Sequence, residues 1–391
     1  MKKNIKRKII CSLVLLVLTG CQKEQFEQVI EVDNPPNQIE VELENTITPE
    51  PLKEVSIIMV GDNLLHDRIY ESGLSENGDY NYDHLYVNTK EIISDYDIAI
   101  VNQEVILGGL DLGLSGYPLF NGGYEIADSL VNAGFDIICH STNHSIDQGS
   151  IGVENCLNNW TSKYPDIGIV GINLSFEQQD EIYIKEVNGI KIAILNYTYG
   201  LNGLSMPSSK EYLVNMLDES EVKKDIIEAE QIADFTIVCP HWGTEYTHSE
   251  SSYQTNWANF MVDLGADLII GTHPHVIQPV RWVESENGNK ALVYYSLGNF
   301  INATNQYGDV SKRMLGEMAT INIVNENGST EIVDYDAIPI VSHIDVDPKE
   351  TTVYILSDYT NELAERNLIK YQDSKFSLDY LNNLWDDMIV E

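Results

Sequence analysis

The chain has 391 residues, of which 23 are Lys or Arg and 61 are Asp or Glu, so its formal net charge is −38. Such an acidic chain is not expected to bind nucleic acid or anionic lipid through its overall charge, because like charges repel. The length is sufficient for one large domain, or for one domain with appendages.

The first twenty residues have the composition of an export signal. Met1–Lys8 is basic, and Ile9–Leu18 is apolar but too short to remain in the membrane as a spanning helix. Leu18-Thr19-Gly20-Cys21 resembles the lipobox at which bacterial lipoproteins are cleaved and lipidated; an ordinary cleavage site with a chance cysteine is the alternative. We predict a lipoprotein signal peptide over residues 1–20 and an extracytoplasmic protein anchored to the cell membrane through lipidated Cys21.

Residues 21–53 are rich in Gln, Glu, Asn and Pro and contain few large apolar side chains. A segment of this composition cannot bury enough apolar surface to offset the conformational entropy that is lost on folding. We therefore predict a disordered acidic tether over residues 21–53, with the folded part beginning at about residue 54.

From residue 54 on, strand-like and helix-like segments alternate. Apolar runs predict strands and amphipathic runs predict helices, in the order strand 55–60, helix 84–94, strand 98–101, helix 122–133, strand 135–139, helix 151–160 and strand 167–170. The later segments are helix 219–233, strand 235–239, helix 253–264 and strand 266–270. Repeated strand–helix units of this kind favour an α/β fold.

Three Asn-Gly pairs lie between strand-like runs. They are Asn188-Gly189, Asn287-Gly288 and Asn327-Gly328, and such pairs are typical of tight hairpin turns. Strands 182–187 and 190–195, 280–284 and 292–295, and 317–324 and 331–340 are therefore predicted to form hairpins. The predicted fold class is α/β with mixed sheets, and the C-terminal extension over 343–391 is predicted to contain a strand and then helices.

Polar side chains of the kinds that bind metals follow six of the predicted strands. In chain order they are Asp62, Glu104, the group Asn143, His144 and Asp147, then His241, the pair His273 and His275, and Asn299. The carboxyl ends of parallel strands meet at one edge of a sheet, where ligands of open α/β sheets bind. We therefore expect these side chains to converge.

The loop Gly271–His275 is the most informative part of this set. It places two imidazoles one residue apart directly after the apolar run Ala266–Ile270, where they can share a metal ion. Carboxylate, amide and imidazole ligands without cysteine suit divalent Mn, Zn or Fe better than they suit a closed structural zinc site. We predict one or two such ions as cofactors.

Several of these residues also have a structural alternative. Asp62 can cap a helix, Glu104 can be a solvated loop acid, Asn143-His144 can form a turn, and His241 can serve the neighbouring Trp242. His66 is a weaker candidate than these. Residues interpreted as structural or surface groups are Asp67, His84, His140, His248, His343 and Asn299.

The ordered motifs resemble those of the bacterial capsule synthesis protein CapA family over about residues 54–342. The matching segments are Gly61-Asp62, Asn102–Glu104, Asn143–Gly149, His241–Tyr246, Gly271–Gln278 and Tyr295–Phe300. The resemblance implies a calcineurin-like metallophosphatase fold, which is a four-layer α/β/β/α sandwich of two mixed sheets. It also implies a role in making or exporting an anionic capsule polymer of the poly-γ-glutamate type.

The resemblance further implies roles for individual residues. The implied metal ligands are Asp62, Glu104, Asn143, His241, His273 and His275. His144 would lie near the group that is cleaved, and Asp147 would orient it through a hydrogen bond, so these two are the implied catalytic residues.

The chain departs from the family pattern in two places. Thr142 stands where a second asparagine is usual, and the opening Asp-x-His of the phosphatase superfamily is absent. The nearest substitute for that histidine is His66, four residues after Asp62, so occupancy by one ion or by two remains open.

Two functions fit these features. The first is a membrane-anchored capsule biosynthesis or export protein with a metal-dependent, phosphoesterase-like site. The second is a non-catalytic subunit that binds the anionic polymer or its precursor together with membrane synthase subunits. The shared negative charge of protein and polymer weakens direct binding, although salt screens part of the repulsion.

Overall fold

The computed structural model describes residues 52–389, so the predicted signal peptide, the lipobox and nearly all of the tether lie outside the described residues. The described residues belong to one compact unit, Pro51–Glu391. Within residues 52–389, every helix falls short of the length and apolar character that crossing a membrane requires.

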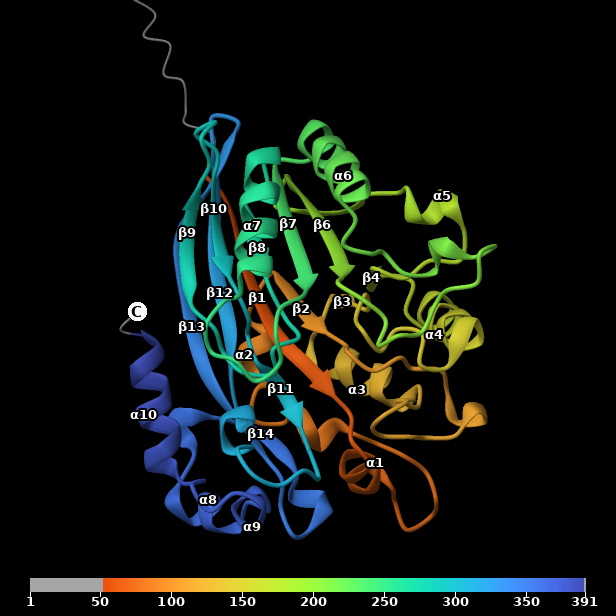
Figure 1. Ribbon diagram of the computed structural model, residues 1–391, viewed down its shortest axis with the longest axis vertical. Coiled ribbons are helices and arrows are strands. Elements are labelled where there is room, and N and C mark those ends of the chain that lie inside the picture. Colours follow the sequence, from red (N-terminus) through yellow and green to blue (C-terminus); the bar gives the residue numbers. More distant parts are fainter. Residues whose placement is uncertain (1–51, 390–391) are drawn as a thin grey trace, which may run out of the picture. The chain divides into compact units, whose positions relative to one another are not determined.

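Two mixed sheets form the centre of the fold (Figure 1). The first has the order β14 (Thr352–Ile355), β13 (Ser329–His343), β12 (Leu315–Glu326), β1 (Lys53–Leu64), β2 (Ile98–Asn102), β3 (Ile137–Cys139) and β4 (Gly168–Val170), with β11 (Asn299–Asn302) paired to the end of β1. The second has the order β5 (Tyr183–Val187), β6 (Ile190–Thr198), β7 (Phe235–His241), β8 (Leu268–Ile270), β10 (Lys290–Tyr294) and β9 (Val280–Glu284). Strands β1–β4 and strands β6, β7, β8 and β10 run parallel within their sheets.

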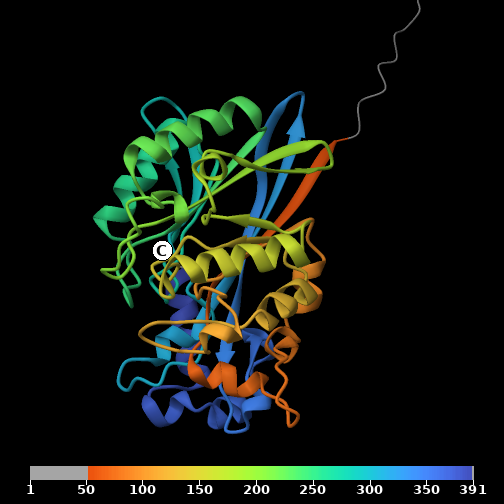
Figure 2. The ribbon, with the colours of Figure 1, turned by 90° about the vertical axis from the view of Figure 1, so that its right-hand side faces the viewer.

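Helices cover the outer faces of both sheets. On the first sheet lie α1 (Asp67–Gly73), α2 (Lys90–Ser94), α3 (Glu125–Ala133), α4 (Gly149–Lys163), α8 (Asn361–Arg366), α9 (Ile369–Gln372) and α10 (Leu378–Ile389). On the second lie α6 (Glu219–Ile232) and α7 (Ser252–Leu264), side by side in Figures 1 and 2, while α5 (Phe176–Gln179) is a short surface turn. A third apolar cluster lies between the sheets, because strands buried on both faces carry apolar residues throughout. The predicted class, a four-layer sandwich of two mixed sheets between helices, is confirmed.

Most of the predicted elements are present, because their signals are local. The three predicted hairpins form, and both residues of Asn188-Gly189 and of Asn327-Gly328 have the positive φ angles that such tight turns require. Helix α6 begins where the Asp218 side chain accepts hydrogen bonds from the backbone of Ser220 and Glu221.

The structure also differs from the predicted elements. The predicted helix 84–94 is divided into a 3-10 turn, Asp83–Tyr86, and the short helix α2. Between them the side chains of Asn88 and Thr89 donate to the backbone carbonyl groups of Val353 and Tyr86, and side-chain bonds of this kind compete with the backbone bonds of a helix. Elements α1 and β11 were not predicted. Strand β14 pairs with β13, so the C-terminal residues extend the first sheet.

Glu317 on β12 is a buried acid that is not among the predicted metal ligands. The side chain is 4% exposed, makes no hydrogen bond to the described residues, and lines a cavity with Tyr294, Tyr335 and Trp385. Burial raises its pKa from 4.5 to about 8. The folded protein therefore retains a proton that the unfolded chain releases, so this group makes stability fall as the pH rises from about 4.5 to about 8.

We expect Glu317→Gln to raise the free energy of unfolding at pH 8 by roughly 1–3 kcal/mol, because the amide removes a charge that burial disfavours. At pH 5 the gain should be smaller, since wild-type Glu317 is then already protonated. Urea unfolding of both proteins at pH 5 and pH 8 measures the difference. An equal gain at the two pH values would contradict the buried-acid interpretation.

Candidate metal centre

The predicted polar residues converge at the carboxyl edge of the parallel strands. Asp62 lies near the end of β1, Glu104 follows β2, and Asn143 follows β3 in the first sheet. His241 ends β7, and the loop with His273 and His275 follows β8 in the second sheet. The site therefore straddles the two sheets, and all six side chains are buried.

Two glycines allow the chain to approach closely beside the site. A Cβ atom at Gly61 would lie 2.0 Å from the carbonyl oxygen of Gly298, and one at Gly271 would lie 2.2 Å from the carbonyl oxygen of Tyr295. Both positions therefore require glycine. They hold Asp62 and the His273 loop within reach of each other, and the backbone amide of His273 lies 3.3 Å from both Asp62 oxygens.

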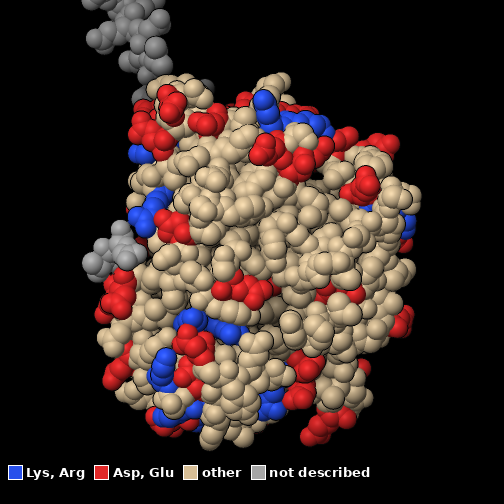
Figure 3. Space-filling model, viewed as in Figure 1, with Lys and Arg blue, Asp and Glu red and all other residues tan. Residues whose placement is uncertain are grey.

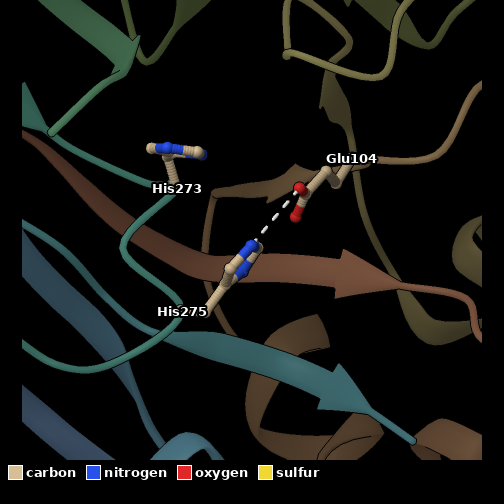
Figure 4. A group of neighbouring side chains, drawn as sticks. All are labelled: Glu104, His273 and His275. Carbon is tan, nitrogen blue, oxygen red and sulfur yellow. Dashed lines mark ion pairs between the residues drawn. The ribbon is translucent and has the colours of Figure 1, made fainter. Parts of the chain in front are cut away.

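Glu104, His273 and His275 form a group that can hold a metal ion (Figure 4). One ligand atom from each residue lies within 4.8 Å of the others. Nε2 of His275 is 3.7 Å from Oε1 of Glu104, and Nε2 of His241 is 3.8 Å from the same oxygen. Both loop histidines have positive φ angles, 99° at His273 and 59° at His275, which is strained backbone of the kind that marks functional sites.

Unpartnered buried atoms in this group fit a cation. Both carboxylate oxygens of Glu104 and Nδ1 of His273 are buried without a hydrogen-bond partner among the described residues. Burial raises the pKa of Glu104 well above its usual value and lowers the pKa of His273 and His241 well below theirs, so these two imidazoles are neutral. A buried acid without hydrogen bonds costs free energy that a metal ion would offset. Carboxylate and neutral imidazole are also the ligand types that divalent ions accept.

Asp62 is held by donors on both oxygens. Oδ1 accepts from Asn102 Nδ2 at 2.8 Å, and Oδ2 accepts from Nδ1 of His275 at 3.0 Å. Burial alone would lower the pKa of His275, but the carboxylates of Glu104 and Asp62 outweigh it and raise the pKa to about 9, so a bound metal ion would take the place of the proton on Nε2. Asp62 thus orients His275 from behind, in the manner of a carboxylate that supports a metal-binding histidine.

Asn143 and His241 complete the wall of the site. Nε2 of His241 lies 3.0 Å from Oδ1 of Asn143, and its Nδ1 lies 3.0 Å from the hydroxyl of Thr272. Asn143 also donates to Asn202 at 3.2 Å. These contacts fix the orientation of the His241 ring.

His144 and Asp147 form a buried pair at the edge of the same cavity. Nδ1 of His144 is 2.7 Å from Oδ2 of Asp147, and that oxygen also accepts from the backbone amide of Phe120. The ring of Phe120 packs edge-on to His144 at 4.6 Å. The pair therefore holds the proton on Nδ1 and leaves Nε2 to take or give a proton.

A cavity of about 430 Å³ opens beside these residues. Asn143, His144 and His275 line it, and so do His66 and Arg313. His66 lies outside the group that can hold a metal, and burial lowers its pKa to about 3. The cavity is large enough for a substrate group to reach the metal ligands and His144 together.

Several residues at the site were not predicted from the sequence to have a role there. Asn102 bridges Asp62 and His241, Thr272 bonds His241, and Asn202 lies 3.3 Å from Nε2 of His144. Asn102 and Thr272 lie inside two of the predicted motifs, so their position next to a predicted ligand could have indicated a role at the site. Asn202 and Arg313 belong to no such motif.

Three of the residues interpreted as structural lie outside the group that can hold a metal ion. His140 accepts from the indole of Trp160, and His343 pairs with Asp345. Asn299 braces the site loop, because its amide donates to the backbone carbonyl groups of His275 and Arg313.

Comparison with known proteins finds a matching family model and two similar curated proteins. A family model described as "Bacterial capsule synthesis protein PGA_cap" matches residues 56–304, which is more than half of the chain. The chain is 33% identical over 178 residues to the PGA biosynthesis protein CapA of Bacillus subtilis (strain 168), and 30% identical over 181 residues to the capsule biosynthesis protein CapA of Bacillus anthracis. Each alignment spans 45% of this chain, and 45% and 42% of the two relatives, so the chain matches less than half of their length.

Solved structures with a similar arrangement include phosphoesterases. A putative 5′-nucleotidase from Staphylococcus aureus covers 73% of this chain and is itself covered to 54%, with 15% identity and a TM-score of 0.47. A 5′-nucleotidase precursor from Thermus thermophilus covers 74% and is covered to 54%, with 14% identity and a TM-score of 0.44. The calcineurin-like phosphoesterase YfkN from Bacillus subtilis covers 74% and is covered to 91%, with 15% identity and a TM-score of 0.42.

Proposed function

This chain belongs to the bacterial capsule synthesis protein family, and from that premise we propose that its buried cluster is a divalent-metal site of phosphoesterase type that acts in making or exporting an anionic capsule polymer. The observation that carries the proposal is the Glu104 carboxylate, which is buried without a hydrogen bond to the described residues and faces His275, with His273 in reach of the same point. A buried acid in that setting favours a bound cation.

Glu104, His273 and His275 would hold the ion, with Asp62, Asn143 and His241 as further ligands or as supports of those ligands. Mn, Zn and Fe are the proposed ions, because the ligand set is mixed carboxylate and imidazole without thiolate. When bound, such an ion lowers the pKa of a coordinated water and polarises the bond to be cut.

His144 supplies the proton chemistry in this proposal. Asp147 accepts from Nδ1–H and stabilises the doubly protonated ring, so the second proton, on Nε2, is the one that would pass to the leaving group. The ring of Phe120 packs edge-on against the His144 ring and helps to hold it in place.

We also propose that the protein acts outside the cytoplasmic membrane, held by a lipid on Cys21, with capsule polymer or its precursor and membrane synthase subunits as partners. The support is the basic and apolar N-terminal sequence followed by Leu18–Cys21. Mass spectrometry of the protein from its native membrane should find Cys21 as a lipidated N-terminus. An intact Met1 would contradict the anchor.

The test of the enzymatic proposal is hydrolysis of a generic phosphodiester by the purified protein. We expect activity with added Mn²⁺ and loss of that activity with EDTA, since the chemistry depends on the ion. In a capsule-deficient strain that lacks the gene, a variant without the metal ligands should fail to restore polymer at the cell surface. Restoration by that variant would instead favour the non-catalytic assembly subunit.

A further inference from the structure

We propose that Arg313 forms an anion subsite next to the metal centre, where it binds a second negatively charged group of the substrate, either a carboxylate or a phosphate. The proposal rests on the proposed function, because the subsite shares the cavity in which the metal-dependent reaction would take place. Arg313 lies in a short 3-10 turn, Ser311–Met314, between β11 and β12.

Arg313 is the one Lys or Arg among the described residues that line this cavity, and Asn143, His144 and His275 line it too. Glu245 is the one Asp or Glu among the described residues that line it, and the chain as a whole is acidic, with 61 Asp and Glu against 23 Lys and Arg. Figure 3 shows acidic side chains scattered over the face in view, with fewer basic ones among them. A cation kept at this place therefore offers the cavity a local attraction for anions.

The guanidinium group of Arg313 has no acidic partner within 4.0 Å in residues 52–389. Its neighbour Lys312 differs, because its ammonium group is 2.7 Å from Asp309. Nη1 of Arg313 donates to the neutral Gln306 side chain at 2.7 Å, Nε is buried without a partner, and Nη2 makes no hydrogen bond to the described residues. Two of the three guanidinium nitrogens of Arg313, Nε and Nη2, are thus without a partner among the described residues.

The guanidinium plane is also held in position. Cζ lies 3.5 Å from the ring centroid of Tyr246, an aromatic contact that fixes the plane of the guanidinium group. Tyr246 also stacks on His275, with ring centroids 5.8 Å apart, and it has a strained φ angle of 61°. Asn299 adds a second connection, because its amide nitrogen donates to the backbone carbonyl of Arg313 and its Oδ1 lies 3.1 Å from His275 Nδ1.

This geometry suits an oxyanion. A planar guanidinium can bind a carboxylate or a phosphate through two parallel hydrogen bonds, whereas a lysine offers only a point charge. Because Tyr246 joins Arg313 to the metal-binding His275, a group bound at Arg313 places the neighbouring part of the same substrate at the metal ligands. Substrates with two anionic groups would therefore be preferred.

The test compares Arg313→Gln and Arg313→Lys with wild type in the full-length purified chain after EDTA treatment, so that metal does not contribute to binding. Titration calorimetry at low salt with inorganic phosphate and with γ-glutamylglutamate reports the two anion types separately. We expect the Gln variant to bind at least one probe about tenfold more weakly or worse, and the Lys variant to be intermediate. The affected probe identifies the group as phosphate or carboxylate.

Lys312→Gln is the matched control, because it makes the same charge change one residue away in a side chain that already pairs with Asp309. It should leave both affinities unchanged. Unaltered binding of both probes to Arg313→Gln, with wild-type thermal stability, would overturn the subsite even if phosphodiesterase activity is present. Weakened binding without any metal-dependent activity would retain the subsite and reject the proposed hydrolase.

Discussion

Replacement of His273 and His275 together by alanine will remove the bound divalent ion and abolish metal-dependent hydrolysis. The two side chains supply two of the three ligand atoms that lie within 4.8 Å of one another, so their loss removes most of the group that can hold the ion. Elemental analysis of the purified proteins should find a transition metal in the wild type and none in the double variant. Turnover of a phosphodiester with added Mn²⁺ should fall to the background of the uncatalysed reaction.

Thermal unfolding gives a second measure of the same change. Added Mn²⁺ should stabilise the wild type by about 2.7 kcal/mol at a metal concentration about a hundred times the dissociation constant, because the ion binds only the folded chain. The double variant should show no such shift.

The matched control is the double variant His84→Ala with His248→Ala, which removes two imidazoles that bond to Ser72 and to the carbonyl of Ile277 instead. It should keep its metal and its activity. Equal metal content in the two double variants would remove the basis of the proposed centre.

Replacement of His144 by alanine should lower the turnover number by about 10²–10⁴-fold while the metal content stays at the wild-type level. The effect is confined to proton transfer, because His144 belongs to the Asp147 pair and not to the group that can hold the ion. Steady-state kinetics and elemental analysis of the same preparation separate the two quantities.

Asp147→Asn should give a smaller loss of turnover, since an amide can still bond to His144 but no longer stabilises its protonated form. The partial loss distinguishes a positioning role from a structural one, provided that the unfolding midpoint is unchanged. Full activity in His144→Ala would show that another group transfers the proton.

The proposed centre and the Arg313 subsite together explain how an acidic protein can handle an anionic substrate. The repulsion expected from a net charge of −38 acts over the whole surface, whereas a metal ion and one unpaired guanidinium act at short range inside the cavity. Local cations therefore offset the unfavourable average field where the substrate binds.

Much of the fold follows from local sequence signals. Asn188-Gly189 and Asn327-Gly328 adopt the positive φ angles that Asn and Gly tolerate. Ser251 caps the start of helix α7 through reciprocal hydrogen bonds with Gln254. The position of His273 and His275 after a buried strand was also evident, because the alternation of strands and helices puts such loops at one edge. These properties depend on neighbours a few residues apart.

Other features depend on contacts that the sequence order hides. Strand β1 continues past Gly61 because β11, far along the chain, pairs with Asp62–Leu64. The oxygens of Asp62 are taken up by Asn102 and His275, and Arg313 reaches Tyr246 from a different turn. The residue types of the site were therefore determined by the sequence alone. The partner of each side chain was decided only by the tertiary structure, because hydrogen bonds and ring contacts form between atoms that are close in space, whatever their separation along the chain.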